Sequence, residues 1–240
     1  MSATVQLLAW DSQFFGFGVA RLTGEGLTSA QAAAALAECR AAGARLVYWH
    51  ARPADAATNQ AARQHGAWLA DRKVTFAMPL PPHQATTPAD ADIVATTTGT
   101  PQLEALAWQA GAYSRFALDP RLPANAFRHL YSEWLRNSLN GTIAQAVLTL
   151  PDATGHALGL LTLGEKNGRA DIGLLAVDAP ARGQRVGRRL VAEAGRRAAG
   201  AGFAGLQVVT QRANAVACRF YESCGFALAQ EEYIYHLWLA

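Results

Sequence analysis

Apolar and polar positions in residues 1–80 follow the pattern of a small α/β unit. Four runs rich in apolar and β-branched residues are typical of strands, and they cover residues 4–9, 17–22, 45–51 and 74–80. Alanine-rich segments between these runs predict two helices, one at 29–43 that ends at Gly43 and one at about 55–65. Strands and helices are therefore expected to alternate along this part of the chain.

Residues 92–240 show a longer alternation of the same two periods. Helical spacing of apolar side chains predicts helices, and these cover 101–111, 123–139, 186–199 and 214–225. Shorter apolar runs predict strands, and these cover 92–96, 144–150, 157–164, 169–177, 205–211 and 231–240. The last run is apolar on both faces, which predicts an interior strand of its sheet.

The order of these elements predicts a mixed α/β fold. In the second region a hairpin comes first and crossover helices come later, so the sheet should combine antiparallel with parallel strands. Residues 81–91 are rich in Pro, Thr and Ala, which is typical of a linker or a long surface connection. We therefore expect an N-terminal α/β domain at 1–80, a linker at 81–91 and a second domain at 92–240.

Composition indicates a globular chain without a membrane span. Of the 240 residues, 51% are hydrophobic and 16% charged, and no apolar run approaches the roughly 18 residues needed to cross a bilayer. No basic segment precedes the first apolar residues, so we expect a cytoplasmic protein. Cys39, Cys218 and Cys224 form neither a CxxC pair nor a zinc-type cluster, which fits a reduced compartment and predicts no metal site.

An arginine-rich stretch, ARGQRVGRRL at residues 181–190, follows the apolar strand at 169–177. Together with Arg196 and Arg197 it places six arginines within 16 residues whose only acid is Glu193. A strand, a glycine-containing turn and a helix start form a phosphate-binding pocket, because the first N–H groups of a helix are unpaired and carry partial positive charge. The alternative is a capped helix with a solvated basic face.

Several other phosphate and nucleic-acid binding modes are excluded. The Walker A pattern GxxxxGK[ST] does not occur, and GFGVAR at 16–21 lacks the third glycine and the helix of a dinucleotide fingerprint. The net charge of +3 is too small to favour a nucleic-acid partner, and no aromatic residues are interleaved with the arginines.

A second motif, NAVACRFYESCGF at residues 214–226, lies beyond the next strand. Asn214 can cap the helix that it begins, Gly225 can end that helix, and Phe220 and Tyr221 can simply pack. Taken together with VDAPARGQRVGRRLV at 177–191, however, the segment resembles the paired signatures of the GNAT superfamily of acyl-CoA-dependent N-acyltransferases. The resemblance implies the GNAT fold, acetyl-CoA as co-substrate and N-acetyltransferase activity.

The resemblance also implies roles for individual residues. The pyrophosphate of coenzyme A would lie on the backbone of Arg182, Gly183, Gln184, Arg185, Val186, Gly187 and Arg188. The pantetheine arm would pair with the strand edge and contact the next helix, at Leu175, Ala176, Val177, Asn214 and Phe220. The amide near Val177 would polarise the thioester carbonyl. Tyr221 would protonate the departing thiolate, because a phenol pKa near 10 lies above that of a thiol.

Arg185 is a departure from the family pattern Q/R-x-x-G-x-G/A, which has glycine at this position. Its backbone amide remains available as a donor. The space for a close approach of a phosphate oxygen is smaller.

Three further segments carry the acceptor side of the resemblance, LAWDSQFFG at 8–16, AYSRFALDP at 112–120 with the helix after it, and IGLLAV at 172–177 with the last third of the chain. They resemble GNAT members that acetylate the 4-amine of TDP-linked 4-amino-4,6-dideoxyhexoses, so a small nucleotide amino sugar is the expected partner. The candidate contacts are Trp10, Phe14 and Phe15 for a sugar or base, and Ser114 and Arg115 for an anionic group. Alternatively, WDSQFFG is a strand followed by an aromatic core turn.

No motif names the base that takes a proton from the sugar ammonium. Asp71 is our candidate, because it lies just past the Gly66 turn on the strand that enters 74–80, and it could act through a water molecule. Glu165 and Asp11 are rivals. An exposed Asp71 without a catalytic role is the competing interpretation.

Residues 58–80 resemble a shortened form of residues 213–239. An asparagine (Asn59) and a glycine (Gly66) recur at matching positions, but no tyrosine takes the position of the acid. The N-terminal region is therefore expected to be a smaller, truncated and non-catalytic GNAT-like domain.

Two other functions stay open at this point. One is acetylation of a different amine, such as another amino sugar, an aminoglycoside or a protein N-terminus. The other is a non-catalytic acyl-CoA-binding module, against which Tyr221 argues because a module that only binds needs no acid. Either a monomer or a homodimer fits the sequence.

Overall fold

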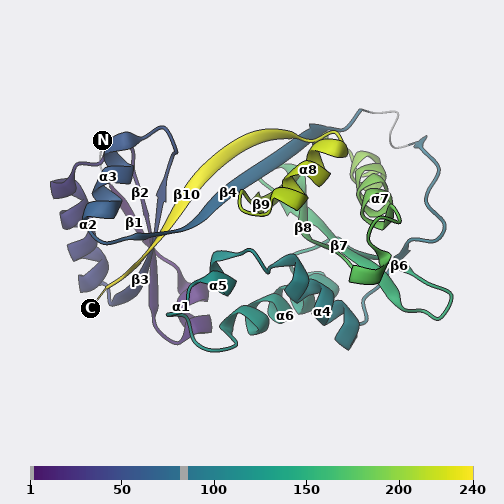
Figure 1. Ribbon diagram of the computed structural model, residues 1–240, viewed down its shortest axis with the longest axis horizontal. Helices are drawn as coiled ribbons and strands as arrows, with labels where there is room; N and C mark the ends of the chain where they lie inside the picture. The colour runs from purple at the N-terminus through teal and green to yellow at the C-terminus, as the bar shows by residue number, and fades with distance from the viewer. Residues whose placement is uncertain (1–2, 82–85, 240) are drawn as a thin grey trace.

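The computed structural model describes residues 3–81 and 86–239, which form a single twisted sheet of ten strands with helices packed around it (Figure 1). The strands are β1 (Thr4–Leu7), β2 (Gly18–Thr23), β3 (Ala44–Ala51), β4 (Trp68–Pro79), β5 (Val94–Ala95), β6 (Ala146–Pro151), β7 (Ala157–Lys166), β8 (Arg169–Val177), β9 (Gly205–Gln211) and β10 (Ala227–Trp238). Their order in the sheet is β1-β2-β3-β10-β4-β9-β8-β7-β6-β5. Residues 82–85 of the expected linker lie outside the described residues.

Eight α-helices are present in the described ranges. They are α1 (Ala9–Phe15), α2 (Ser29–Ala41), α3 (Ala56–Gln64), α4 (Pro101–Ala110), α5 (Arg115–Leu118), α6 (Ala126–Leu139), α7 (Val186–Gly200) and α8 (Ala215–Ser223). No helix in this part of the chain is long and apolar enough to cross a membrane.

Strand β10 lies in the interior of the sheet, as its two apolar faces predict. It pairs antiparallel with β3 on one side and with β4 on the other. Ile234, Tyr235 and His236 are each at most 1% exposed, because the strand is covered on both faces. In Figure 1 the long strands β4 and β10 run side by side between the two halves of the molecule. The mixed α/β sheet expected from the sequence is therefore confirmed.

Two short helices were not predicted from the sequence. Residues 9–15 form α1 where a strand end and a turn were expected, and Gly16 ends the helix in the left-handed conformation at φ 75°. Residues 115–118 form the single turn α5. Helices of one or two turns show too few apolar positions to reveal the helical period.

Strands β8 and β9 separate part of the way along their length. Their parallel pairing covers only Ala170–Ile172 on β8, and beyond this point the ladder between these two fully described strands ends. One extra residue in β8 opposite β7 forms a bulge at this place, and the Thr162 hydroxyl accepts the N–H of Leu174 at 2.8 Å. A bulge bends its strand, so residues 173–177 present an open edge toward the helix that follows β9.

Three apolar cores support the sheet. One lies under α7 and α8, a second lies under α1, α4, α5 and α6, and a third lies under α2 and α3. Figure 1 shows α7 and α8 on the opposite side of the sheet from α4, α5 and α6. Neighbouring residues on one strand, such as Leu160 and Leu161, belong to different cores because strand side chains alternate between faces.

Candidate active site

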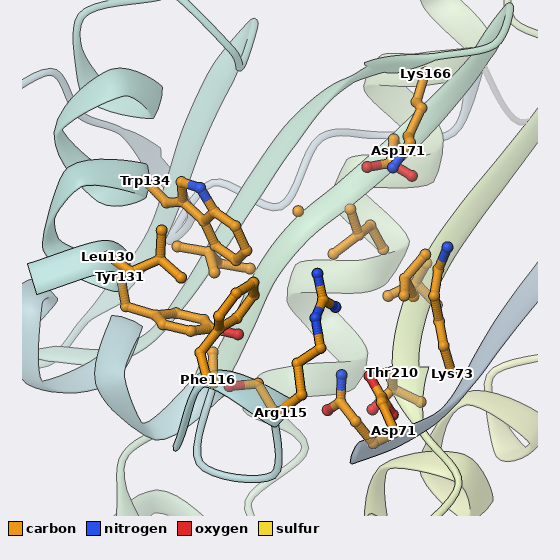
Figure 2. Close-up of a pocket in the computed structure, with 18 of the residues that line it drawn as sticks. Asp71, Lys73, Arg115, Phe116, Leu130, Tyr131, Trp134, Lys166, Asp171 and Thr210 are labelled. Atoms are coloured by element: carbon orange, nitrogen blue, oxygen red, sulfur yellow. The ribbon is translucent and has the colours of Figure 1, made fainter. Parts of the chain in front are cut away.

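A cavity of about 570 Å³ lies where the two halves of the chain meet (Figure 2). Eight of its lining residues come from the first 80 residues, and the rest come from residues 110–234. The sequence-predicted residues that line it are Trp10, Asp71, Ser114, Arg115, Leu175, Asn214 and Tyr221. The rival bases Asp11 and Glu165 line it as well.

Tyr221 lies on α8 and forms part of the cavity wall. It is 5% exposed and packs edge-on against Phe220 and Phe226. Burial raises the pKa of its phenol above the ordinary value, so the group keeps its proton at neutral pH. The N-cap of α8 is Asn214, whose side chain accepts the N–H of Ala217 at 3.1 Å, as the sequence predicts.

Asp71 lies on β4 and is 6% exposed, so the exposed Asp71 of the competing interpretation is wrong. Burial raises the pKa of its carboxyl to about 6, and the positive charges of Arg115 and Lys73 offset only part of that effect. Its Oδ1 atom is buried and has no hydrogen-bond partner in the described chain. A carboxyl group with a pKa near neutrality can both accept and release a proton under physiological conditions. Burial also raises the pKa of Asp11.

Arg115 is the first residue of α5 and projects into the middle of the cavity. Figure 2 shows its guanidinium between the aromatic side chains of the α5–α6 region and the strand that carries Asp71 and Lys73. The guanidinium carbon lies 4.7 Å from the ring centre of Tyr48 and 4.3 Å from that of Phe116. The Arg115 Nε atom is buried without a hydrogen-bond partner in the described ranges, and the charge of the side chain acts on Asp11 and Asp71 across the cavity. The guanidinium can therefore still bind an anionic ligand.

The predicted aromatic residues of α1 have different surroundings. Trp10 lines the cavity, is 46% exposed, and stacks on Phe14 with ring centres 5.1 Å apart and an interplanar angle of 11°. Phe14 does not line the cavity and supports Trp10 from behind. Phe15 is 8% exposed and packs between Phe17 and Phe116 in the core, so we leave it out of the acceptor contacts.

The arginine-rich loop lies at the start of α7, at a distance from this cavity along β8. Gly183 has φ 79° and Arg185 has φ 64°, both in the left-handed region that favours glycine. Arg185 is the N-cap of α7, and no side chain caps the helix there. The start of this 15-residue helix therefore keeps N–H groups for an external anion, which fits a pyrophosphate.

Gly187 packs tightly between the loop and the second motif. A Cβ atom at this position would lie 3.1 Å from Phe220 Cζ and 3.3 Å from Val177 Cγ2. The coenzyme residues predicted on β8, α7 and α8 are thus brought into one layer beside the open edge of β8.

Three of the six arginines in this region are neutralised by acids. Arg189 binds Asp90 and Asp92, and Arg196 and Arg197 bind Glu193, with all N–O distances between 2.6 and 2.8 Å. The arginines nearest the loop, at 182, 185 and 188, form no ion pair within the described residues. The positive charge is therefore concentrated at the helix start.

Sequence reasoning missed five cavity residues of the N-terminal region, of which the polar or aromatic strand residues Tyr48, His50 and Lys73 are the most informative; Leu8 and Arg21 are the others. Tyr48 and His50 are two apart on β3, and Lys73 is two apart from Asp71 on β4, so each pair lies on one face of its strand. Strand alternation could have grouped these pairs, but nothing local indicated which face meets the cavity.

Comparisons with known proteins identify the family and agree with the fold. The model of the acetyltransferase (GNAT) family matches residues 103–226. A GCN5-related N-acetyltransferase from Sphaerobacter thermophilus superimposes with a TM-score of 0.61 at 17% identity, covering 99% of this chain and 76% of that one. The chain belongs to the GNAT family and is an acyl-CoA-dependent N-acetyltransferase. Members of this family use acetyl-CoA in general.

The names of two relatives refer to polysaccharide biosynthesis or to acetylation of a nucleotide sugar. The chain is 31% identical over 228 residues to the dTDP-fucosamine acetyltransferase of Escherichia coli O6:H1 (strain CFT073), and the match covers 93% of each protein. It is also 30% identical over 125 residues to the spore coat polysaccharide biosynthesis protein SpsD of Bacillus subtilis (strain 168), covering 52% of this chain. That second match spans only 43% of the length of SpsD.

Proposed function

We propose that the protein transfers the acetyl group of acetyl-CoA to the 4-amine of a TDP-linked 4-amino-4,6-dideoxyhexose. The observation that carries this proposal is the extent of the likeness to dTDP-fucosamine acetyltransferase, which includes the N-terminal region. That region supplies eight residues of the cavity wall. A likeness confined to the coenzyme motifs would leave the acceptor undetermined.

The coenzyme would bind along the layer formed by the α7 loop, the open edge of β8 and α8. The N–H groups at the start of α7, together with the arginines at 182, 185 and 188 that form no ion pair in the described residues, would hold the pyrophosphate. Residues 174–177 would pair with the pantetheine arm where β9 has separated from β8. Acetyl-CoA supplies the thioester that is attacked, and the Val177 amide would polarise its carbonyl.

Asp71 and Tyr221 would move the two protons of the reaction. Asp71 would take a proton from the sugar ammonium, directly or through water, at a pKa near 6. The freed amine then attacks the thioester carbonyl, and Tyr221 would give its proton to the sulfur as the carbon–sulfur bond breaks. The second proton, which the nitrogen loses as the amide forms, would restore the phenol of Tyr221. Both side chains line the same cavity.

Arg115 and Trp10 would recognise the nucleotide part of the acceptor. The unpaired guanidinium of Arg115 suits a phosphate, which it can bind through two N–H groups. The exposed face of Trp10, held flat by Phe14, suits stacking of a base or a sugar. Binding energy from these remote contacts would orient the amine at the thioester.

A steady-state comparison of acceptors tests this function. Wild-type protein with acetyl-CoA is given TDP-4-amino-4,6-dideoxygalactose, its 4-epimer, the matching UDP sugar, the free amino sugar, a polyamine and a peptide N-terminus, and thiol release is measured. The TDP-linked sugar should give the highest kcat/KM, and the kcat/KM for the free amino sugar should be a small fraction of that value. If a polyamine or peptide outcompetes every nucleotide sugar, the proposed acceptor is wrong, and the assignment to the GNAT family is unaffected.

Matched variants separate recognition from folding. Arg115→Ala and Trp10→Ala should raise KM for the TDP sugar while KM for acetyl-CoA is unchanged. Arg128→Ala is the control for the first, because Arg128 also lies over an aromatic ring, 4.8 Å from Trp108, but outside the cavity. Tyr113→Ala is the control for the second, because Tyr113 is 45% exposed and does not line the cavity.

A further inference from the structure

The helix that carries Arg115 is too short to hold its own conformation. Helix α5 has four residues, and Ser114 at its start makes no side-chain cap. A single turn of helix is unfavourable unless tertiary contacts fix it, because nucleation costs more than one hydrogen bond returns. The position of Arg115 in the cavity therefore depends on what holds the two ends of this turn.

Asp119 holds the C-terminal end of the turn. Its backbone N–H donates to the Arg115 carbonyl at 3.0 Å, so one hydrogen bond links the two residues directly. Its carboxylate is completely buried, and it accepts the N–H of Arg121 at 3.0 Å through Oδ1. Oδ2 accepts two further hydrogen bonds, which come from a different part of the chain.

These two donors lie on β10. His236 Nδ1 lies 2.7 Å from Asp119 Oδ2, and Trp238 Nε1 donates to the same oxygen at 2.9 Å. Because β10 is an interior strand paired on both sides, its backbone cannot move without disturbing the sheet. The carboxylate thus fastens a single helical turn to a strand that is paired on both sides.

The histidine also reaches Arg115 through an aromatic contact. His236 and Tyr48 are directly opposite each other on β10 and β3, and their rings stack with centres 5.0 Å apart at 25°. The Tyr48 ring in turn contacts the Arg115 guanidinium at 4.7 Å. Arg115 is therefore fixed at its backbone through Asp119 and at its side chain through Tyr48.

The charge states of His236 and Asp119 fit a structural anchor. Burial lowers the pKa of His236, and Asp119 offsets only part of this effect, so the ring is neutral and donates from Nδ1. The other ring nitrogen, Nε2, is buried without a hydrogen-bond partner in the part of the chain that the structure describes. Neither His236 nor Asp119 lines the cavity, so neither can touch an acceptor.

We propose that Asp119, fastened to β10 by His236 and Trp238, is a positioning residue that fixes Arg115 for binding of an anionic group of the acceptor. This inference rests on the proposed function, which gives Arg115 its ligand. It predicts that acceptor binding is sensitive to three residues that lie outside the cavity.

The test is a double-mutant cycle between Asp119→Asn and Arg115→Ala. Asp119→Asn keeps the shape of the side chain, removes its charge and leaves only one oxygen to accept hydrogen bonds. It should lower kcat/KM for TDP-4-amino-4,6-dideoxygalactose on the order of tenfold or more, because small misplacements of a positioning group are costly. KM for acetyl-CoA should be unchanged. On the Arg115→Ala background the same substitution should have no further effect.

Two substitutions at His236 distinguish loss of the Asp119 hydrogen bond from a general loss of folding. His236→Asn places an amide donor near the position of Nδ1 and should restore most of the acceptor kcat/KM that His236→Leu loses. Tyr235→Phe is the matched control, because it removes a buried hydrogen bond, 2.8 Å from Tyr235 Oη to Asn59, from the next residue of the same strand. This control should leave KM for the acceptor unchanged.

A spectroscopic measurement makes the outcome independent of the acceptor. The ¹H–¹⁵N signal of the Arg115 Nε–H group, identified by its absence in Arg115→Ala, should report an ordered side chain in the wild type and lose that order in Asp119→Asn. If the signal is unchanged in Asp119→Asn, or if the loss of kcat/KM is equal with and without Arg115, the positioning inference is wrong. If Asp119→Asn loses the order but Arg115→Ala has normal KM for the TDP sugar, Asp119 does position Arg115, and it is the assignment of the acceptor to Arg115 that is wrong.

Discussion

Replacing Asp71 with asparagine should stabilise the protein while removing its activity. The pKa of Asp71 is about 6 in the folded protein, against an ordinary value of 3.8, because the carboxyl is buried with one oxygen unpartnered. The folded state therefore binds this proton more tightly than the unfolded state does, and stability is lost as pH rises from about 4 through 6. At about 1.4 kcal/mol per pKa unit, a pKa about two units higher costs about 3 kcal/mol above pH 7.

Asparagine has the same shape and no charge, so the Asp71→Asn variant does not incur this cost. Urea unfolding followed by tryptophan fluorescence at pH 4, 6 and 8 measures the difference in free energy of unfolding between variant and wild type. That difference should grow by about 2.4 kcal/mol between pH 4 and pH 8, while thiol release with the TDP sugar falls close to background.

The control for this measurement is Asp152→Asn. Hydrogen bonds from Thr154 lower the pKa of Asp152 in its exposed turn, so the variant should lose stability relative to wild type as pH rises. A difference for Asp71→Asn that stays flat with pH would refute the burial argument. Retained activity in Asp71→Asn would refute the assignment of Asp71 as the base.

Four further outcomes follow from the site. Tyr221→Phe should keep acetyl-CoA affinity while turnover falls on the order of 10²–10⁴-fold, measured by calorimetry and thiol release; unchanged turnover would place Tyr221 in the core only. The acid limb of wild-type kcat/KM should have its midpoint near pH 6, where Asp71 loses its proton, and a midpoint near 4 would contradict this. Arg185→Gly should raise the free energy of unfolding by about 1 kcal/mol, because the residue has φ 64°, and an unchanged urea midpoint would argue against strain. Gly187→Ala should destabilise the protein by about 1–3 kcal/mol and raise KM for acetyl-CoA, because the new methyl group meets Phe220; a normal KM would show that the loop adapts.

The local geometry of the candidate coenzyme site could be predicted from the sequence because its signals are local. Asn214 caps α8 within one short motif, and Gly187 packs against Phe220 of that motif from the other. The sequence also predicted the interior position of β10, because a strand that is buried on both faces lacks the usual alternation of apolar and polar residues.

The acceptor side could be predicted only in part, because its contacts join distant segments. Asp119 and His236 are 117 residues apart, and neither lies in a motif. Phe14 and Phe15 are adjacent on a short helix, and only the packing of α1 against α5 decides that one supports Trp10 and the other enters the core. Propensity and periodicity carry no information about such pairings.

The place of β10 between β3 and β4 has a consequence for how the chain is made. Synthesis proceeds from the N-terminus, so β3 and β4 leave the ribosome long before residues 227–238 exist. During that interval two strand edges that will be covered by β10 are open, and open edges invite pairing with other chains. The nascent N-terminal region therefore carries two open strand edges until residues 227–238 are made, and the candidate cavity, with the contacts that hold Arg115, is complete only with the last strand.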